Sequence, residues 1–191
     1  MPRQGLDAGQ VVEEAVRIAD ADGLEAGTLA RVSATLGVRA PSLYNHVAGR
    51  EALLRGIALH GLRELGDALR RAAVGRARED ALVAVAHAYR AYAHAHPGCF
   101  AATVAAPAAG DVEHEQAAAE VVGVIAAIVV GWGIEDDDAI HAVRTVRSAL
   151  HGFVTLEAAG GFCTPVDCDA SFERLLQTLA AGLASVAPAP A

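Results

Sequence analysis

The stretch of residues 38–47 constrains the fold most strongly, because it lies between two glycines and has room for only one short helix. Pro41 suits the first turn of a helix, where its missing N–H costs no hydrogen bond. Leu43 and Val47 lie four residues apart and would share the buried face of this helix. We therefore predict a helix that exposes its remaining side chains, which include an arginine, a tyrosine, an amide and a histidine.

The residues before this stretch predict two further helices. Asp7 and Gln10 have the spacing of a capping box at the start of the first helix, which would end at Gly23. Thr28 would cap the second helix, and Gly37 would end it after about two turns. Two helices joined by a tight glycine-containing turn are typical of a helix-turn-helix. In that motif the second helix enters the major groove of DNA and meets base edges.

The chain after residue 50 shows helical spacing of apolar residues throughout and no strand pattern. Pro97, Pro107 and Gly160 mark expected helix ends. Asp169 or Ser171 would cap the last helix. Together these segments predict an all-α fold of about nine helices.

Charge and cysteine content narrow the classes of function. The 15 basic residues are all arginine and stand against 23 acidic residues, which gives a net charge of −8. Residues 1–55 are close to neutral, so they can bind DNA if their arginines face phosphates, although the acidic remainder lowers non-specific binding. The three cysteines lack zinc-type spacing, and we find neither a signal peptide nor an apolar run long enough to cross a bilayer. We therefore expect a cytoplasmic protein without a membrane partner.

Four short motifs follow one another at fixed spacing in the N-terminal third, at residues 28–32, 36–38, 40–47 and 49–54. In order and spacing they resemble the TetR family of one-component transcriptional regulators. The later stretch at residues 150–157, Leu-His-Gly-Phe-Val-Thr-Leu-Glu, is similar to a C-terminal domain type of that family.

The resemblance implies a homodimer in which a three-helix DNA-binding domain, residues 1–50, precedes a helical ligand-binding and dimerisation domain, residues 51–191. It also implies a palindromic double-stranded DNA operator and a small-molecule effector that releases it. Carried over position by position, phosphate contacts fall to Thr28, Tyr44, His46 and Arg50, and base contacts to Arg39, Ala40, Pro41, Ser42 and Asn45. Alanine at position 40 replaces a common polar base-reading residue and can touch only a thymine methyl group.

Candidate effector contacts are the large side chains of the later helices together with one polar helical stripe. They are Tyr89, Tyr92, Phe100, Trp132, His141, Arg144, Ser148 and His151. The alternative for the aromatic residues is ordinary core, and the alternative for the stripe is a solvated face. Small residues opposite the stripe, with the last helix, form the candidate dimer seam: Ala149, Gly152, Leu156, Ala159, Phe172, Leu176, Leu179 and Leu183.

Two other classes of function remain open from the residues alone. One is a metal-binding or enzymatic helical bundle, since His114 and His141 each follow an aspartate by three residues. Both pairs fall at expected helix starts, whereas bundle metal sites lie deep in helices, so we predict no metal, no cofactor and no catalytic residue. The other alternative is a protein-interaction module with a helix-turn-helix shape.

Overall fold

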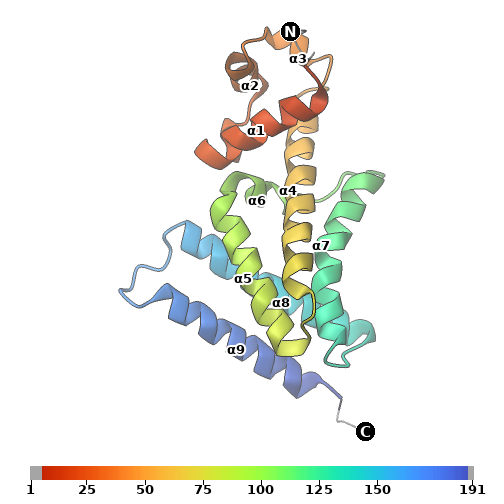
Figure 1. The fold of residues 1–191 in the computed structure, drawn as a ribbon, viewed down its shortest axis with the longest axis vertical. Coiled ribbons are helices and arrows are strands. Elements are labelled where there is room, and N and C mark those ends of the chain that lie inside the picture. Colours follow the sequence, from red (N-terminus) through yellow and green to blue (C-terminus); the bar gives the residue numbers. More distant parts are fainter. Residues whose placement is uncertain (1–5, 189–191) are drawn as a thin grey trace. The chain divides into compact units, whose positions relative to one another are not determined.

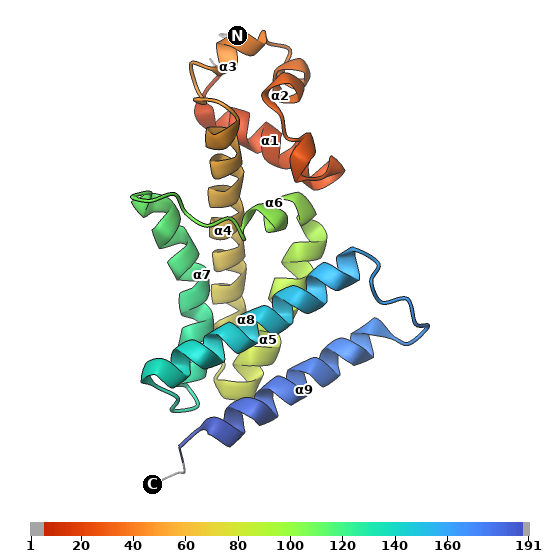
Figure 2. The same ribbon diagram turned by 180° about the vertical axis from the view of Figure 1, so that it is seen from behind.

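The computed structural model describes residues 6–188, which form nine α-helices, one short 3-10 helix and no strand (Figures 1 and 2). The predicted all-α fold is confirmed for these residues. In chain order the elements are α1 Ala8–Asp22, η1 Leu24–Ala26, α2 Leu29–Leu36, α3 Ala40–Leu43, α4 Arg50–Ala73, α5 Arg78–Ala95, α6 Pro97–Ala102, α7 Val112–Val130, α8 Asp136–Ala158 and α9 Cys168–Val186.

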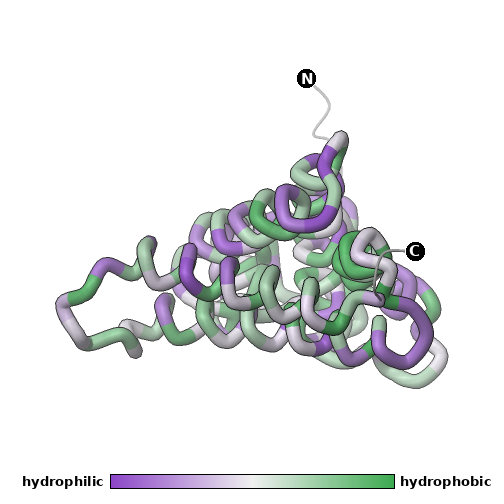
Figure 3. The backbone as a smooth tube through the Cα atoms, turned by 90° about the horizontal axis from the view of Figure 1, so that it is seen from below, coloured by the Kyte–Doolittle hydropathy of each residue, from purple (hydrophilic) through white to green (hydrophobic). Residues whose placement is uncertain are grey.

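The described residues divide into two compact units. The first unit contains the chain up to Glu64 and Ala95–Ala118, and the second contains Leu65–His94 and the chain from residue 119 onward. Helices α4 and α7 contribute residues to both units. Hydrophobic and hydrophilic residues alternate along the helices, as expected when each helix turns one face to a core (Figure 3). The functional boundary placed at residue 50 stays a prediction.

The helix ends of the first unit follow the predicted local chemistry. Asp7 Oδ1 accepts from the Gln10 backbone N–H at 2.8 Å, and Gln10 Oε1 accepts from the Asp7 backbone N–H at 3.1 Å, which confirms the capping box. Thr28 Oγ1 accepts from the Arg31 backbone N–H at 3.2 Å and caps α2. Gly37 ends α2 in the left-handed conformation, with φ of 66°.

Helix α6 is fastened to α1 by a close backbone approach. A Cβ on Gly98 would lie 2.2 Å from the carbonyl carbon of Ala19, so only glycine fits here. The Asp20 carboxylate accepts from the Cys99 backbone N–H at 2.8 Å and lies 2.9 Å from His96 Nδ1. Asp20 thereby satisfies a donor in the first turn of α6 that has no partner within the helix.

Helices α8 and α9 lie side by side in the second unit (Figure 2). The expected cap of α9 at Asp169 or Ser171 is wrong. Asp167 caps the helix, since its side chain accepts from the Asp169 backbone N–H at 3.0 Å. This earlier start leaves the Asp169 carboxylate free to pair with Arg90 at 2.7 Å.

Candidate nucleic-acid interface

The predicted DNA-reading helix is shorter than expected. Regular helix extends only over Ala40–Leu43, with Arg39 at the N-cap in extended conformation and Pro41 in the first turn, as predicted. The helix predicted over residues 38–47 is therefore too long. The backbone N–H groups of His46 and Val47 both donate to the Leu43 carbonyl at 2.9 Å, so the chain closes as a hydrogen-bonded turn instead of continuing the helix.

The short helix and this turn present one exposed surface. Leu43 and Val47 are buried as predicted and attach the segment to the first unit. Tyr44 is 61% exposed, which is high for a large aromatic side chain. Ala40 and His46 are half-buried. The remaining predicted base-reading residues are exposed on the same segment: Arg39, Pro41, Ser42 and Asn45.

The arginines around this surface differ in their partners. Arg50 Nη2 lies 2.5 Å from Glu25 Oε2, and both side chains are at least half exposed. Arg31 pairs with Asp22, and these side chains are 48% and 47% exposed. Arg39 makes no ion pair with any residue between 6 and 188. Because exposed pairs are weak, a phosphate can displace either acid, while the charge of Arg39 needs no such exchange.

Thr28 lies at the N-cap of α2 and is half-buried. Its Oγ1 accepts the capping hydrogen bond, so its hydroxyl proton is still available for donation to a phosphate oxygen. The structure therefore places a hydroxyl donor on α2 and a guanidinium at the start of α4, one on each side of α3 in the chain.

Two of the eight candidate effector contacts are joined directly within the second unit. Tyr89 OH lies 3.1 Å from His151 Nδ1, which joins α5 to α8. Burial raises the pKa of Tyr89 to about 12, and burial followed by the charge of Arg147 lowers the pKa of His151. Tyr92 and Trp132 are also buried in the second unit, whereas Phe100 is buried in the first. Three residues of the polar stripe are exposed to solvent: His141, Arg144 and Ser148. The eight assignments stay predictions.

The candidate dimer seam separates into two sets. Leu156 is 52% exposed, and Ala159 is also exposed, while Ala149 and Gly152 are half-buried. The α9 members of the seam are buried within one protomer, which corrects their assignment: Phe172, Leu176, Leu179 and Leu183. Their apolar spacing identified a buried face, but that face packs inside the second unit, for example where the rings of Phe172 and Phe153 lie 5.1 Å apart.

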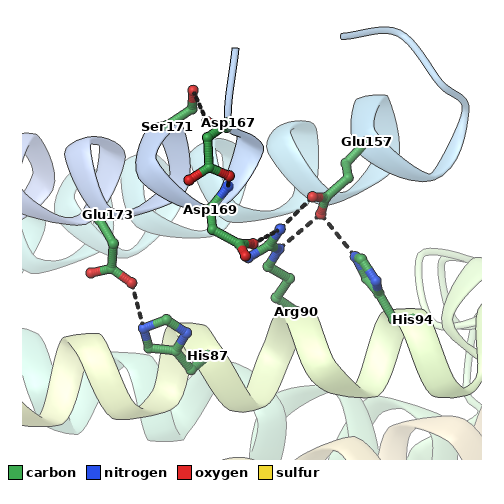
Figure 4. Close-up of polar contacts among 8 residues, drawn as sticks. All are labelled: His87, Arg90, His94, Glu157, Asp167, Asp169, Ser171 and Glu173. Carbon is green, nitrogen blue, oxygen red and sulfur yellow. Dashed lines mark hydrogen bonds and ion pairs between the residues drawn. The ribbon is translucent and has the colours of Figure 1, made fainter. Parts of the chain in front are cut away.

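A polar cluster that the sequence did not reveal holds α8 and α9 to α5 (Figure 4). Arg90 binds Glu157, lies 2.7 Å from Asp169 and covers the Phe172 ring at 4.9 Å. His94 Nε2 lies 2.8 Å from Glu157 Oε2. Arg90 lowers the pKa of Glu157, with a smaller contribution from His94. No local spacing predicts this cluster, because each of its contacts joins residues more than sixty positions apart in the chain.

Two further features bear on the other classes of function. Within residues 6–188, no helix is both long and apolar enough to cross a bilayer. In the same part of the chain, no group of three or more histidine, cysteine, aspartate or glutamate side chains is placed to hold a metal ion. Asp111, one member of the candidate pairs, instead binds Arg55, with its two oxygens 2.5 and 2.6 Å from the guanidinium.

Comparisons with known proteins agree with this architecture. A family profile described as the tetracyclin repressor-like C-terminal domain matches residues 82–179. The HTH-type transcriptional regulator Rv0681 of Mycobacterium tuberculosis is 36% identical over 179 residues, which cover 93% of this chain and 82% of that relative.

Solved structures give the same result. A protein from Rhodococcus sp. RHA1 superposes with a TM-score of 0.80 at 25% identity, over 96% of this chain and 99% of its own. BioQ in complex with its double-stranded DNA operator superposes with a TM-score of 0.71 at 26% identity, over 95% of this chain and 99% of its own. The resemblance inferred from the short motifs is confirmed, and the chain belongs to the TetR family of helix-turn-helix transcriptional regulators.

Proposed function

We propose that the protein is a homodimeric repressor that binds a palindromic double-stranded DNA operator and leaves it when a small molecule binds. The observation that carries this proposal is the α3 surface, where Tyr44 and Arg39 stand exposed on a segment anchored by buried Leu43 and Val47. An anchored segment with exposed polar and aromatic side chains suits a major groove. BioQ, a similar protein, is described with its DNA operator, which supports the same use here.

The side chains divide into positioning and reading groups in this proposal. Phosphates are contacted by Thr28, Tyr44, His46 and Arg50, which fix the segment on the duplex without reading its sequence. Base edges are contacted by Arg39, Ala40, Pro41, Ser42 and Asn45. Guanine suits Arg39, adenine suits Asn45, and Ala40 can contact only a thymine methyl group. With so few polar readers, specificity requires two copies of the segment held at a fixed spacing.

The exposed face of α8 and α9 supplies the dimer contact in this proposal. A Cβ built on Gly152 of α8 or on Gly182 of α9 meets nothing within 4 Å, so helices of a second copy can approach closely at both positions. Exposed Leu156 would be covered by the partner. The effector would bind within residues 51–191 and change the spacing of the two reading segments, with a coupling of about 1–3 kcal/mol. The protein would act in the cytoplasm, without catalysis.

Selection of bound sequences from a random DNA pool tests this function. We expect an enriched palindrome with half-sites spaced by about one helical turn of duplex or a multiple of it. Binding of that palindrome should weaken steeply with salt, because phosphate contacts release counterions. Tyr44→Ala should lower affinity for all sequences, whereas Tyr44→Phe separates the loss of the hydroxyl from the loss of the ring.

Two results would contradict the proposal. A chain that retains no DNA at low salt is an interaction module with this fold. A Tyr44→Ala variant that binds the selected palindrome as tightly as the wild type would show that α3 does not contact DNA. Leu156→Glu tests the dimer separately, since it should shift sedimentation toward a monomer and weaken binding of the full palindrome more than of a half-site.

A further inference from the structure

A cavity of about 580 Å³ lies within the first unit, among η1, α4, α6 and the start of α7. Its volume falls in the range of small-molecule sites. Most of its wall consists of alanine, valine and leucine side chains, which include Leu24, Ala52, Ala58 and Ala102. Short alanine side chains leave this space open. None of the eight effector contacts predicted from the sequence lines it.

One buried polar atom in this wall makes no hydrogen bond within the part of the chain that the structure describes. His114 is 4% exposed, and its Nε2 makes no hydrogen bond with any described residue. A buried polar atom without a hydrogen bond is costly, so native proteins rarely retain one without a use. An imidazole nitrogen either donates or accepts, depending on the tautomer, and a hydroxyl group can satisfy either form.

The charged groups of the wall already have partners or carry the wrong sign for an anion. Arg55 binds Asp111 through two hydrogen bonds and Glu113 through a third of 2.7 Å. This pairing lowers the pKa of Asp111 to about 2, chiefly through the hydrogen bond from Arg55. Glu51 adds a further negative charge. Because the cation is occupied, the wall favours an uncharged ligand over a carboxylate or a phosphate.

We propose that this cavity binds an uncharged, largely apolar small molecule that places one hydroxyl or carbonyl group against His114 Nε2. The regulatory part of the proposal rests on the DNA-binding function proposed above. Leu24 of η1 connects α1 to α2, and Ala52 lies in the first turn of α4, directly after the DNA-reading turn. Helix α6, which supplies Ala101 and Ala102 to the wall, is fastened to α1 through Gly98 and Asp20. A bound molecule would therefore contact η1, α4 and α6, the three elements that position the helix-turn-helix.

Calorimetric titration of the full chain with three probes tests the site. The probes are 1-naphthol, naphthalene and 1-naphthoate, which share one apolar body but differ in the hydroxyl and the charge. We expect 1-naphthol to bind about tenfold more tightly than naphthalene, which corresponds to one hydrogen bond, and more tightly than 1-naphthoate. His114→Leu should abolish the preference for 1-naphthol over naphthalene while naphthalene binding persists.

Two further variants keep the result interpretable. His141→Leu makes the same change at an exposed histidine and should bind as the wild type does. Ala52→Leu fills the cavity and should weaken 1-naphthol and naphthalene alike. Thermal unfolding of His114→Leu without ligand should occur at or above the wild-type temperature, because an unpaired buried polar atom is removed. Equal binding of all three probes, or an unchanged preference in His114→Leu, would overturn the site.

Operator binding distinguishes this inference from the function on which it rests. Fluorescence anisotropy with the selected palindrome should show weaker binding when 1-naphthol is present, in the wild type but not in His114→Leu. Operator binding that ignores 1-naphthol would overturn the regulatory role and leave the repressor proposal intact. A protein that binds 1-naphthol through His114 but binds no DNA would support the ligand site and refute the repressor.

Discussion

Two arginines of the first unit and one of the second have opposite roles. In the first unit, Arg39 is exposed without an ion pair to any described residue, and Arg50 is held only by a half-exposed pair with Glu25. In the second unit, Arg90 is 15% exposed, binds Glu157 at 13% exposure and covers the Phe172 ring. Burial, and not residue type, therefore separates an arginine that can bind a partner from one that stabilises the fold.

The largest expected effect follows removal of the buried cation. Arg90→Ala leaves Glu157 without its main partner, so we expect the free energy of unfolding to fall by about 3 kcal/mol. Urea denaturation measures this loss. Arg31→Ala, which removes a half-exposed pair with Asp22 in the first unit, is the control and should change stability by less than about 1 kcal/mol. Equal losses in the two variants would erase the proposed contrast.

A smaller loss of stability is expected at the contact between α6 and α1, which depends on close packing and not on charge. Gly98→Ala forces a Cβ into the Ala19 carbonyl, and such overpacking costs about 1–3 kcal/mol. Operator affinity should fall as well, because α1 belongs to the proposed three-helix DNA-binding domain. Gly123→Ala is the control, since a Cβ there meets nothing within 4 Å and alanine favours helix, and thermal denaturation should show it to be neutral or more stable.

The exposed arginine should affect binding without affecting stability. Arg39→Ala should weaken operator binding by about 1–3 kcal/mol if Arg39 reads a guanine, and it should then relax the base preference at one position. If Arg39 contacts a phosphate, the loss should be uniform across sequences, and the salt dependence of binding should decrease by about one counterion. Unfolding of this variant in urea should match that of the wild type. A large loss of stability would show that Arg39, like Arg90, stabilises the fold.

Arg50 should fall between these cases. Arg50→Ala removes an exposed pair with Glu25, so stability should change by about 1 kcal/mol at most. Glu25→Gln should raise operator affinity slightly, because it frees the guanidinium for a phosphate. An affinity that falls in Glu25→Gln would mean that the pair positions Arg50 for DNA instead of competing with it.

The smallest expected effect is a dependence of stability on acid. The pKa of Glu157 is lowered in the folded state from the value of 4.5 that it has when unfolded. A carboxyl group whose pKa is lowered by folding stabilises the folded state at pH values above its pKa in the unfolded chain. This stabilisation is lost as the pH falls below about 4.5 through the folded pKa. Wild-type stability should therefore fall more steeply in this range than that of Arg90→Ala. Parallel curves would show that Arg90 does not stabilise the charged Glu157.

The features that could be predicted from the sequence are those whose partners are close in the chain. Asp7 and Gln10 are three residues apart, and Thr28 caps a donor three residues away, so local chemistry was sufficient. The short α3 was missed because Pro41 and the apolar spacing predict a helix but not where tertiary packing ends it. The TetR-type fold was recognised from motif order in this same local region.

Contacts between distant residues could not be predicted from the sequence. Arg90 and Glu157 are 67 residues apart, and nothing in either neighbourhood indicates the other. The apolar spacing of Phe172 and Leu176 predicted a buried face correctly but could not tell the core of one protomer from the contact between two. His114 was considered only as a metal ligand, because its burial beside an alanine-lined cavity depends on how α4, α6 and α7 pack.

The bond from Asp20 to the Cys99 backbone also bears on how the first unit opens. Since an α1 side chain protects an α6 amide, and Gly98 leaves no room between the two backbones, α1 and α6 should exchange their amide protons as one cooperative unit. Transient unfolding of the DNA-binding helices then also opens the wall of the cavity. A molecule bound there would slow amide exchange in α1, where it makes no contact, so deuterium uptake by α1 would report occupancy.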